Sequence, residues 1–438
     1  MSTIIRGKVR VPRIARGPRV VRVALAGCGV VGGELVRLLA HGAGEIAARR
    51  DLRFELVSVL VRHPGRPRPD ALPRERVTTE LEAFLAAAAE ADLAVEAIGG
   101  LDPALRIART ALAAGRRLVT ANKALLAAHG PELAALARRS GGRLDFESAV
   151  AGGIPVVRAL RDSLGLTEIR SVRGVLNGTT NYILSRLAEG RPFAEALASA
   201  QALGFAEADP SRDLSGEDAA DKLRILAWLA FGVEPGALIV RRRGLGADPG
   251  RLGDDARLLG GVPRLVAEVV DVRGQGTGDR GQPAEGIVAA VEPVIVPAGS
   301  DLGRARDEEN VVAIESRWNG AVRLSGPGAG GAPTASALLG DMLRAASPAG
   351  RPTLSAHVPV EDARAHTWVL SARREGPTES VLHRTLRRAG VGLVDVLTEP
   401  DRRVAVTRPV PWPRVDLAAR VLESHALAPV VSRCEVRV

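Results

Sequence analysis

The stretch VRVALAGCGVVGGELVRLLA, residues 21–40, decides the fold of the N-terminal part of the chain. An apolar run, a glycine-rich turn and a helical segment are followed by a second apolar run, FELVSVLV at residues 54–61, which gives the order strand, turn, helix, strand. The glycines fit GxGxxG in that context, where the first permits the tight turn, the second admits a pyrophosphate and the third packs helix on strand. We therefore predict a Rossmann-type dinucleotide-binding domain. We expect the phosphates of the bound dinucleotide to lie at the helix N-terminus, held by Gly27, Cys28, Gly29, Val30, Val31 and Gly32.

The end of the second strand indicates which dinucleotide binds. It reads VLVRHPGRPR, residues 59–68, and lacks the acidic residue that usually binds the ribose 2′-hydroxyl of NAD. Arg62, with Arg66 and Arg68 behind it, can instead pair with a 2′-phosphate. The sequence therefore favours NADP over NAD.

Length and cysteine content limit the class of protein. A chain of 438 residues predicts about two to four domains. No apolar run approaches the roughly 20 residues of a membrane helix, and Cys28 and Cys434 have neither metal-site nor disulfide spacing. We expect a soluble cytoplasmic protein with no membrane partner. Residues 1–19 are basic and free of acid, which predicts a flexible extension or, as the weaker alternative, an organelle-targeting peptide.

The net charge of +10 raises the question of nucleic-acid binding. However, the arginines are spread along the whole chain, aromatic residues make up 3%, and no nucleic-acid-binding motif is present. We expect no nucleic-acid partner and attribute the charge to a biased codon usage.

Lysine is scarce in this chain. Among 60 basic side chains the lysines are Lys8, Lys123 and Lys222, and the rest are arginines. Arginine stays protonated at any working pH, whereas burial and neighbouring charges can shift the pKa of a lysine until it exchanges a proton. Lys123, directly after a predicted strand, and Lys222 are therefore candidates for acid–base chemistry. For Lys123 the alternative is a solvated lysine at a helix start, and Lys8 shows that the rule is not absolute.

Six carboxylates precede Lys222 in EADPSRDLSGEDAAD, residues 207–221. Ser215 and Asp218 have the spacing of a capping box for a helix that runs to about Phe231, and Asp218 and Lys222 are four residues apart. One interpretation is a helix cap with a surface ion pair. The other is that Asp218 holds a lysine that transfers a proton, while Glu207 and Asp213 bind a cationic group of a small substrate. Spacing alone does not separate the two.

The same stretch resembles the signature of homoserine dehydrogenase. The resemblance extends in family order over about residues 20–345, and its motifs are GCGVVG, VTANKALLA, ESAVAGGIP, LNGTTNYI, ALGFAEADPSRDLSGEDAADK and GPGAGGAPTASAL. It implies interconversion of aspartate 4-semialdehyde and homoserine with NADP or NAD, in threonine, methionine and isoleucine biosynthesis.

The resemblance also implies roles for individual residues. Lys222 corresponds to the proton donor and Asp218 to its partner, while Lys123 lies beside the nicotinamide and the substrate. Glu207 corresponds to the residue that binds the substrate amino group, with Asp213 nearby. The resemblance further implies that Gly326 and Gly328 close over the cofactor. It also implies a sodium ion held largely through backbone carbonyls, at Glu147, Val150, Gly152 and Ile154.

The last segment reads strand, helix, two strands, helix, strand, and resembles the ACT module that confers feedback control by threonine. It departs from the usual pattern in REGPTESVLHR, where Gly376 precedes Pro377, and in VTRPV, which contains Arg408. Threonine is thus a possible regulator, and the alternative is a module that serves packing or dimerisation alone.

We expect an α/β protein with three structural domains and a homodimer or higher homo-oligomer. The expected division is a basic extension, 1–19; a dinucleotide-binding domain, 20–148; an α+β substrate-binding and dimerisation domain, 149–322; a helix returning to the cofactor domain, 323–345; a linker, 346–362; and an ACT-like domain of ferredoxin-like βαββαβ order, 363–438. Three rival interpretations are another NADP-dependent enzyme that acts on an amino-acid semialdehyde, a catalytically inactive regulator that binds NADP and an amino acid, and a nucleic-acid binder.

Overall fold

The computed structural model describes residues 17–165, 167–272, 286–346, 365–373, 379–398, 402–423 and 430–434. Most of the expected N-terminal extension, residues 273–285, most of the linker at 346–362 and the turn with Gly376 and Pro377 lie outside the described residues.

The N-terminal part forms a parallel six-stranded sheet with the order β3-β2-β1-β4-β5-β6. This is the strand order of a dinucleotide-binding doubly wound fold, so the predicted Rossmann-type domain is confirmed. Its strands are β1 (Arg19–Ala26), β2 (Leu52–Leu60), β3 (Val77–Thr78), β4 (Leu93–Glu96), β5 (Arg117–Thr120) and β6 (Arg143–Asp145). Its helices are α1 (Val30–Arg50), α2 (Leu81–Glu90), α3 (Ala104–Ala113) and α4 (Lys123–Ser140).

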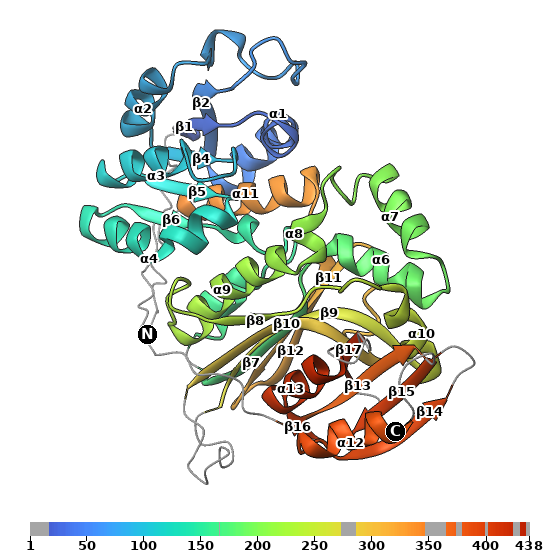
Figure 1. Cartoon of the computed structure of the whole chain (residues 1–438). Coiled ribbons are helices and arrows are strands. Elements are labelled where there is room, and N and C mark those ends of the chain that lie inside the picture. The colour runs from blue at the N-terminus through green and yellow to red at the C-terminus, as the bar shows by residue number, and fades with distance from the viewer. Residues whose placement is uncertain are drawn as a thin grey trace, which may run out of the picture.

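Helices cover both faces of this sheet because its strands are apolar on both sides. Residues of α2, α3 and α4 form one core with Ala24, Ala94 and Leu118 of the strands. On the other face, α1 and the distant helix α11 (Gly331–Ala345) pack on alternate residues of the same strands, among them Val23 and Val95. In Figure 1, α11 is drawn in orange among the blue N-terminal elements, which shows that the chain returns to the first sheet after residue 330 and before it adds its C-terminal strands to the second.

The second sheet contains strands of the middle region and of the C-terminal region. Its order is β12-β11-β7-β9-β10-β17-β13-β15-β14, with β8 paired to β10 and β16 paired to β13. The middle strands are β7 (Ile169–Val175), β8 (Val240–Arg242), β9 (Gly261–Asp271), β10 (Ile287–Pro297), β11 (Glu309–Ser316) and β12 (Gly320–Pro327). The helices of this region are α5 (Val156–Arg158), α6 (Gly178–Ala188), α7 (Phe193–Ala202), α8 (Ser211–Leu214), α9 (Glu217–Phe231) and α10 (Gly250–Leu258).

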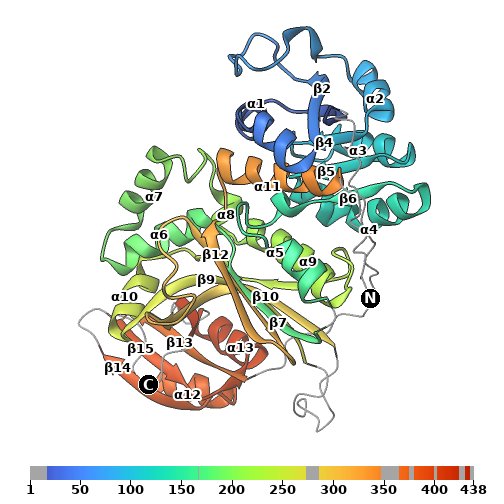
Figure 2. The ribbon, with the colours of Figure 1, turned by 180° about the vertical axis from the view of Figure 1, so that it is seen from behind.

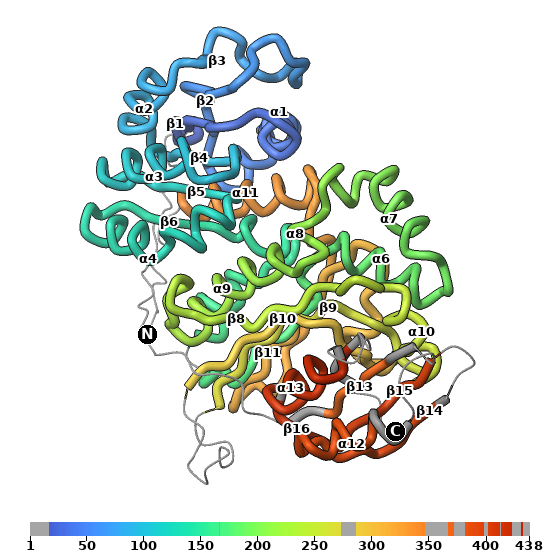
Figure 3. The backbone as a smooth tube through the Cα atoms, viewed as in Figure 1, coloured from blue at the N-terminus to red at the C-terminus, as the bar shows by residue number. Residues whose placement is uncertain are grey.

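The C-terminal elements follow the expected order of strand, helix, two strands, helix, strand, with one additional short strand. They are β13 (Ala365–Arg373), α12 (Glu379–Arg388), β14 (Leu393–Thr398), β15 (Arg402–Thr407), β16 (Val410–Pro411), α13 (Trp412–Glu423) and β17 (Val430–Cys434). The last strand, β17, pairs in parallel with β10 and antiparallel with β13, so it joins this region to the middle sheet. Figure 2 shows the continuous sheet from behind, and Figure 3 traces the path of the chain through it.

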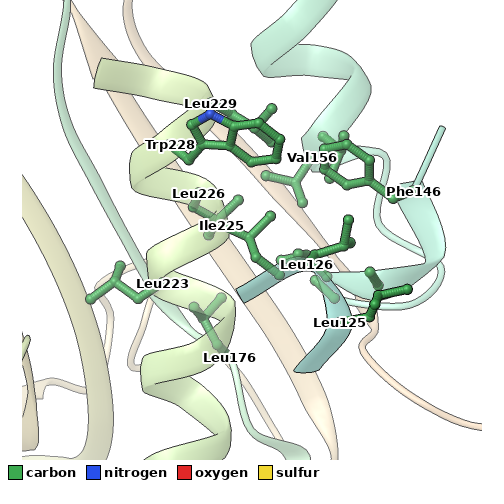
Figure 4. Packing of buried hydrophobic residues seen from close by; sticks show 14 of the residues in the cluster. Leu125, Leu126, Phe146, Val156, Leu176, Leu223, Ile225, Leu226, Trp228 and Leu229 are labelled. Carbon is green, nitrogen blue, oxygen red and sulfur yellow. The ribbon is translucent and has the colours of Figure 1, made fainter. Parts of the chain in front are cut away.

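The helix that carries the predicted proton donor is held against the N-terminal domain by apolar packing. Trp228 of α9 stacks on Phe146, with ring centroids 5.8 Å apart. Neighbouring side chains of α9 pack with Leu125 and Leu126 of α4 in the same core, as Figure 4 shows. Burial of these groups fixes α9 relative to α4, and these two helices carry the lysines singled out above.

Candidate active site

Lys123 and Lys222 contact the same carboxylate. The Nζ of Lys222 lies 2.8 Å from Oδ2 of Asp218, and the Nζ of Lys123 lies 3.0 Å from Oδ1. The side chains of Asp218 and Lys222 are each 11% exposed, whereas that of Lys123 is 36% exposed. The pairing of Asp218 with Lys222 is therefore buried, and the interpretation of a solvated surface pair is wrong.

The two lysines lie near the N-termini of two helices, α4 beside the first sheet and α9 beside the second. Lys123 is the first residue of α4, whose N-cap is Asn122, with its side chain accepting a hydrogen bond from Leu125 N at 3.0 Å. Asp218 lies in the first turn of α9 and Lys222 one turn later, so both point from the same face. The starts of α4 and α9 thus face each other across the Asp218 carboxylate.

The predicted capping box is wrong. The N-cap of α9 is Gly216, in the left-handed conformation with φ of 76°, and no side chain in the described part of the chain caps the helix. Ser215 donates its hydroxyl to Arg212 O at 3.4 Å instead. A left-handed turn is accessible to glycine, and it leaves the Asp218 carboxylate free to contact the lysines.

Electrostatics keep this cluster charged. Burial alone would raise the pKa of Asp218, but the ammonium groups of Lys222 and Lys123 outweigh that penalty and hold it well below its usual range. Burial lowers the pKa of Lys123, whereas the charge of Asp218 and its hydrogen bond raise it, and the net pKa is above its ordinary value. The carboxylate therefore stays ionised at any working pH.

The ammonium group of Lys222 has one N–H donor that its two contacts do not use. Its ammonium group donates to Leu176 O at 2.7 Å as well as to Asp218. Because an ammonium group has three N–H donors, these contacts leave one for a third partner. A buried lysine with a fixed direction and a free N–H has the geometry of a general acid.

Asp213 is joined to this cluster by Asn177, for which the sequence predicted no role. The Nδ2 of Asn177 donates to Asp213 Oδ1 at 2.7 Å and to Asp218 Oδ2 at 2.9 Å. Burial raises the pKa of Asp213, and the neighbouring Asp218 charge adds to that effect. The signal in the sequence was the Asn-Gly pair after a strand, where asparagine is a favoured helix N-cap.

Glu207 is not part of this cluster. Its side chain is exposed, and Gln201 Nε2 donates to its backbone carbonyl at 3.2 Å. Among the described residues, no contact joins its carboxylate to Asp213 or Asp218.

The glycine turn has the close approaches that its pattern predicts. A Cβ on Gly27, where φ is +96°, would lie 2.6 Å from Ala97 O, and a Cβ on Gly32 would lie 2.0 Å from Gly27 O. A Cβ on Gly29 would meet nothing within 4 Å. Gly27 and Gly32 are thus required by the fold itself, whereas Gly29 borders open space at the N-terminus of α1.

A buried acid, Glu96, organises the loop beside this turn. Its carboxylate accepts hydrogen bonds from Ile98 N at 2.8 Å, from Gly99 N at 3.1 Å and from the Thr120 hydroxyl. Thr120 Oγ1 in turn accepts from Asn122 N at 3.0 Å. The network connects the loop beside the glycine turn to the start of α4, where Lys123 lies, and its signal was an acid ending the apolar run of β4.

The arginines after β2 differ in what they contact. Arg68 donates to the carbonyls of Pro64 at 2.8 Å and Arg66 at 2.9 Å, so it builds the loop. Arg62 and Arg66 are exposed. Burial raises the pKa of Cys28, while Arg68, Arg74 and Arg37 lower it, which places three positive charges near the glycine turn. Arg37 and Arg74 were not singled out in the sequence.

The motifs ESAVAGGIP and GPGAGGAPTASAL lie against each other. A Cβ on Gly152 would be 2.7 Å from Gly328 O, and Gly153 N donates to Pro327 O at 3.0 Å. A Cβ on Gly328 would overlap the side-chain amide of Asn310. The turn 150–154 and the glycine segment 326–330 therefore pack backbone to backbone.

Two family models match the chain. One, described as homoserine dehydrogenase, matches residues 155–343, and the other, described as homoserine dehydrogenase, NAD binding domain, matches residues 27–147. The homoserine dehydrogenase of Corynebacterium glutamicum is 39% identical over 333 residues, which cover 76% of this chain and 73% of the relative. This chain belongs to the homoserine dehydrogenase family. It is accordingly an NAD(P)-dependent oxidoreductase that interconverts aspartate 4-semialdehyde and homoserine.

Other homoserine dehydrogenases agree with this assignment. The enzyme of Mycobacterium tuberculosis is 40% identical over 328 residues, covering 74% of this chain and 72% of its own. The crystal structure of a homoserine dehydrogenase from Thiobacillus denitrificans has a TM-score of 0.81 and 30% identity, and the match covers 96% of this chain and 99% of that one. A hyperthermophilic archaeal homoserine dehydrogenase in complex with NADPH has a TM-score of 0.61 and 26% identity, over 74% of this chain and 97% of that one. No helix in the described part of the chain is long and apolar enough to span a membrane.

Proposed function

We propose that Lys222 is the residue that gives a proton to the aldehyde oxygen of aspartate semialdehyde and takes it back when homoserine is oxidised. The observation that carries this proposal is the ammonium group of Lys222, which is fixed by Asp218 and Leu176 O with one N–H left over. NAD(P), when bound, supplies or accepts the hydride. A positioned acid of this kind contributes roughly 10²- to 10⁴-fold to a rate.

The other members of the cluster have supporting roles. Asp218 holds both ammonium groups, and Lys123, which is more exposed, lies on the cofactor side and shares the proton transfer. Asp213 binds the substrate ammonium group, since it is the acid joined to the cluster through Asn177. Glu207, exposed as it stands, completes this binding only by turning toward the substrate.

We propose NADP as the preferred cofactor. Arg62 is exposed after β2 and receives the 2′-phosphate, and the charges of Arg37, Arg68 and Arg74 near Cys28 favour an anion there. The pyrophosphate lies against residues 27–32 at the start of α1. Gly326 and Gly328 close over the cofactor from the second sheet, which the packing of residues 326–330 on the turn 150–154 supports.

We propose that this turn holds a sodium ion through backbone oxygens of Glu147, Val150, Gly152 and Ile154. The backbone is left-handed at Ala151 and Gly152, with φ of 56° and 46°, so this turn departs from regular secondary structure and its carbonyls are not all used in a helix or sheet. The carboxylate of Glu147 accepts from Val157 N and Arg158 N, both at 2.8 Å, so only its carbonyl is offered. Carbonyl oxygens suit a hard cation. Activity in sodium chloride that persists unchanged in choline chloride would reject the site.

We propose further that the enzyme is a cytoplasmic homodimer or higher homo-oligomer with the domain division given above. The C-terminal elements form an ACT-like module docked on the middle region: Arg241 and Arg243 lie over the Trp368 ring, at 5.6 Å and 5.8 Å from its centroid. We propose threonine as its effector. Mass photometry tests the oligomer, and inhibition titrated with threonine tests the effector.

The activity itself is tested with purified protein by reduction of NADP and of NAD at alkaline pH. Homoserine is compared with the longer and shorter amino-acid alcohols, because a rival semialdehyde enzyme would prefer one of those. We expect homoserine to give the largest kcat/KM. Activity with another amino-acid alcohol alone would overturn the assignment of substrate, and binding of NADP without turnover would indicate a regulator.

A further inference from the structure

Asn177 stands at the junction of three elements. It follows β7, caps α6 and reaches the start of α9, and it is 4% exposed. Its Oδ1 accepts hydrogen bonds from Thr180 N at 2.8 Å and from Thr180 Oγ1 at 2.9 Å.

This cap fixes which way the side-chain amide points. A backbone N–H can only donate, so the atom that faces Thr180 N must be the oxygen, and the nitrogen must face the other way. There its two hydrogens are directed to Asp213 Oδ1 and Asp218 Oδ2, at 2.7 Å and 2.9 Å. The hydrogen-bonding capacity of this amide is therefore fully used.

The bridge joins two carboxylates that would otherwise repel each other. The pKa of Asp213 is raised by burial and by the charge of Asp218, and the hydrogen bond from Asn177 acts in the opposite direction. Lys222 also lowers the pKa of Asp213, while its direct contact is with Asp218. The charged groups that act on this cluster are Asp213, Asp218, Lys222, Lys123, Asp221 and Arg212.

We propose that Asn177 is a positioning residue of the homoserine dehydrogenase reaction, whose amide nitrogen sets the distance and direction between the Asp213 carboxylate and the Asp218–lysine cluster. Asp213 binds the ammonium end of the substrate and Lys222 acts at its hydroxyl end, so this amide determines how the substrate lies between them. The inference rests on the roles proposed above for Asp213 and Lys222.

The decisive variant is Asn177→Asp. Asparagine and aspartate are equally good N-caps, so the cap of α6 is kept, while the bridging donor becomes a third carboxylate. We expect kcat/KM for homoserine to fall about 100-fold or more, as for loss of two hydrogen bonds to charged groups. We expect KM for homoserine to rise and KM for NADP to stay within about twofold, because Asn177 contacts no part of the dinucleotide turn. The acid limb of the pH dependence of kcat/KM for homoserine should move to higher pH. The reason is that the added negative charge favours the protonated forms of Asp213 and the lysines.

A second variant covers failure of the first to fold. Asn177→Ser also caps α6 but adds no charge, and it should lose activity in the same direction with a smaller shift of the acid limb. The matched control is Asn181→Asp, one turn further along α6, where the amide donates to the carbonyls of Asp307 and Glu309 at 2.9 Å and 3.1 Å. It measures what this exchange costs in stability away from the carboxylates.

The proposal is overturned if Asn177→Asp has the KM for homoserine and the acid limb of the wild type. It is also overturned if both Asn177 variants lose activity only in proportion to a lowered thermal midpoint, as the control does, because that result indicates a structural cap alone. The roles proposed for the lysines are tested separately with Lys222→Arg. Full activity in that variant rejects the proton transfer by Lys222, while a raised KM in Asn177→Asp still supports the positioning of Asp213.

Discussion

Asp218 Oδ2 lies 2.8 Å from Nζ of Lys222, one helical turn further along α9, and both side chains are 11% exposed. An exposed pair at this spacing contributes only a few tenths of a kcal/mol. A buried pair is different, because removal of one partner leaves a charge without a counter-charge in a poorly solvated place. Asp218 also contacts the ammonium group of Lys123, at 3.0 Å, so loss of Asp218 would leave two ammonium groups without their counter-charge.

The variant Asp218→Asn should therefore destabilise the enzyme at pH 7 by about 3 to 5 kcal/mol, the usual effect of breaking a buried pair. The depressed pKa of Asp218 gives a stabilisation that is present above the ordinary carboxyl pKa of about 3.9 and is lost as pH falls below it. Urea unfolding at pH 7 and at pH 3.5 checks this: the difference from wild type should shrink at the lower pH. An equal difference at both pH values would contradict the electrostatic account.

Gly29→Ala and Gly32→Ala separate cofactor binding from folding. A Cβ on Gly32 would lie 2.0 Å from Gly27 O, so this variant should lower the thermal midpoint and weaken NADP binding together. A Cβ on Gly29 meets nothing within 4 Å, so that variant should keep the midpoint and lose about tenfold or more in NADP affinity through contact with the pyrophosphate. Calorimetry of unfolding and NADP titration supply both readouts. Unchanged affinity in Gly29→Ala would place the dinucleotide elsewhere.

Arg62→Ala should change the preference between cofactors. Loss of a charged contact to the 2′-phosphate should raise KM for NADP about tenfold and leave KM for NAD unaltered. Arg49→Ala, at an exposed arginine near the far end of α1, is the control. If KM for NADP and NAD rise equally in Arg62→Ala, the residue contributes general positive charge and does not read the 2′-phosphate.

Docking of the C-terminal module should depend on pH through Asp255 of α10. Its side chain is buried beside Arg402 of β15, at 3.1 Å, and burial raises its pKa to about 7. The stability that belongs to the protonated form is present below the unfolded pKa of about 3.9 and is lost as pH rises through about 7. Asp255→Asn should thus flatten the fall of the thermal midpoint between about pH 4 and pH 7. Asp254→Asn is the control at a half-exposed carboxylate, which also contacts Arg402, at 3.4 Å. An identical slope in wild type and Asp255→Asn would contradict the role of Asp255.

The N-terminal sheet was predictable because its information is local. A run such as residues 21–40 contains its own turn chemistry and strand pattern, and the strand order β3-β2-β1-β4-β5-β6 follows from right-handed crossovers. The convergence of Lys123 and Lys222 on Asp218 was not predictable from spacing, because Lys123 lies 95 positions before Asp218 in the sequence. Lysine scarcity marked both residues, but only packing of α4 on α9 brings them together.

The mistakes have physical causes as well. The capping box at Ser215 and Asp218 was wrong since spacing does not reveal that Gly216 turns left-handed and starts the helix. Asn177 and Glu96 had no predicted role, because each acts through hydrogen bonds to groups on other elements. Such bridging residues are recognised only once the chain is folded.

The most direct test of the central claim is the rate of homoserine-dependent NADP reduction at alkaline pH in wild type and in Lys222→Arg. Arginine keeps the charge beside Asp218 but does not release a proton at working pH. We predict that kcat falls at least about 100-fold while NADP affinity is retained. An arginine variant as active as wild type would show that Lys222 serves only as a positive charge, and would contradict the proposed proton transfer.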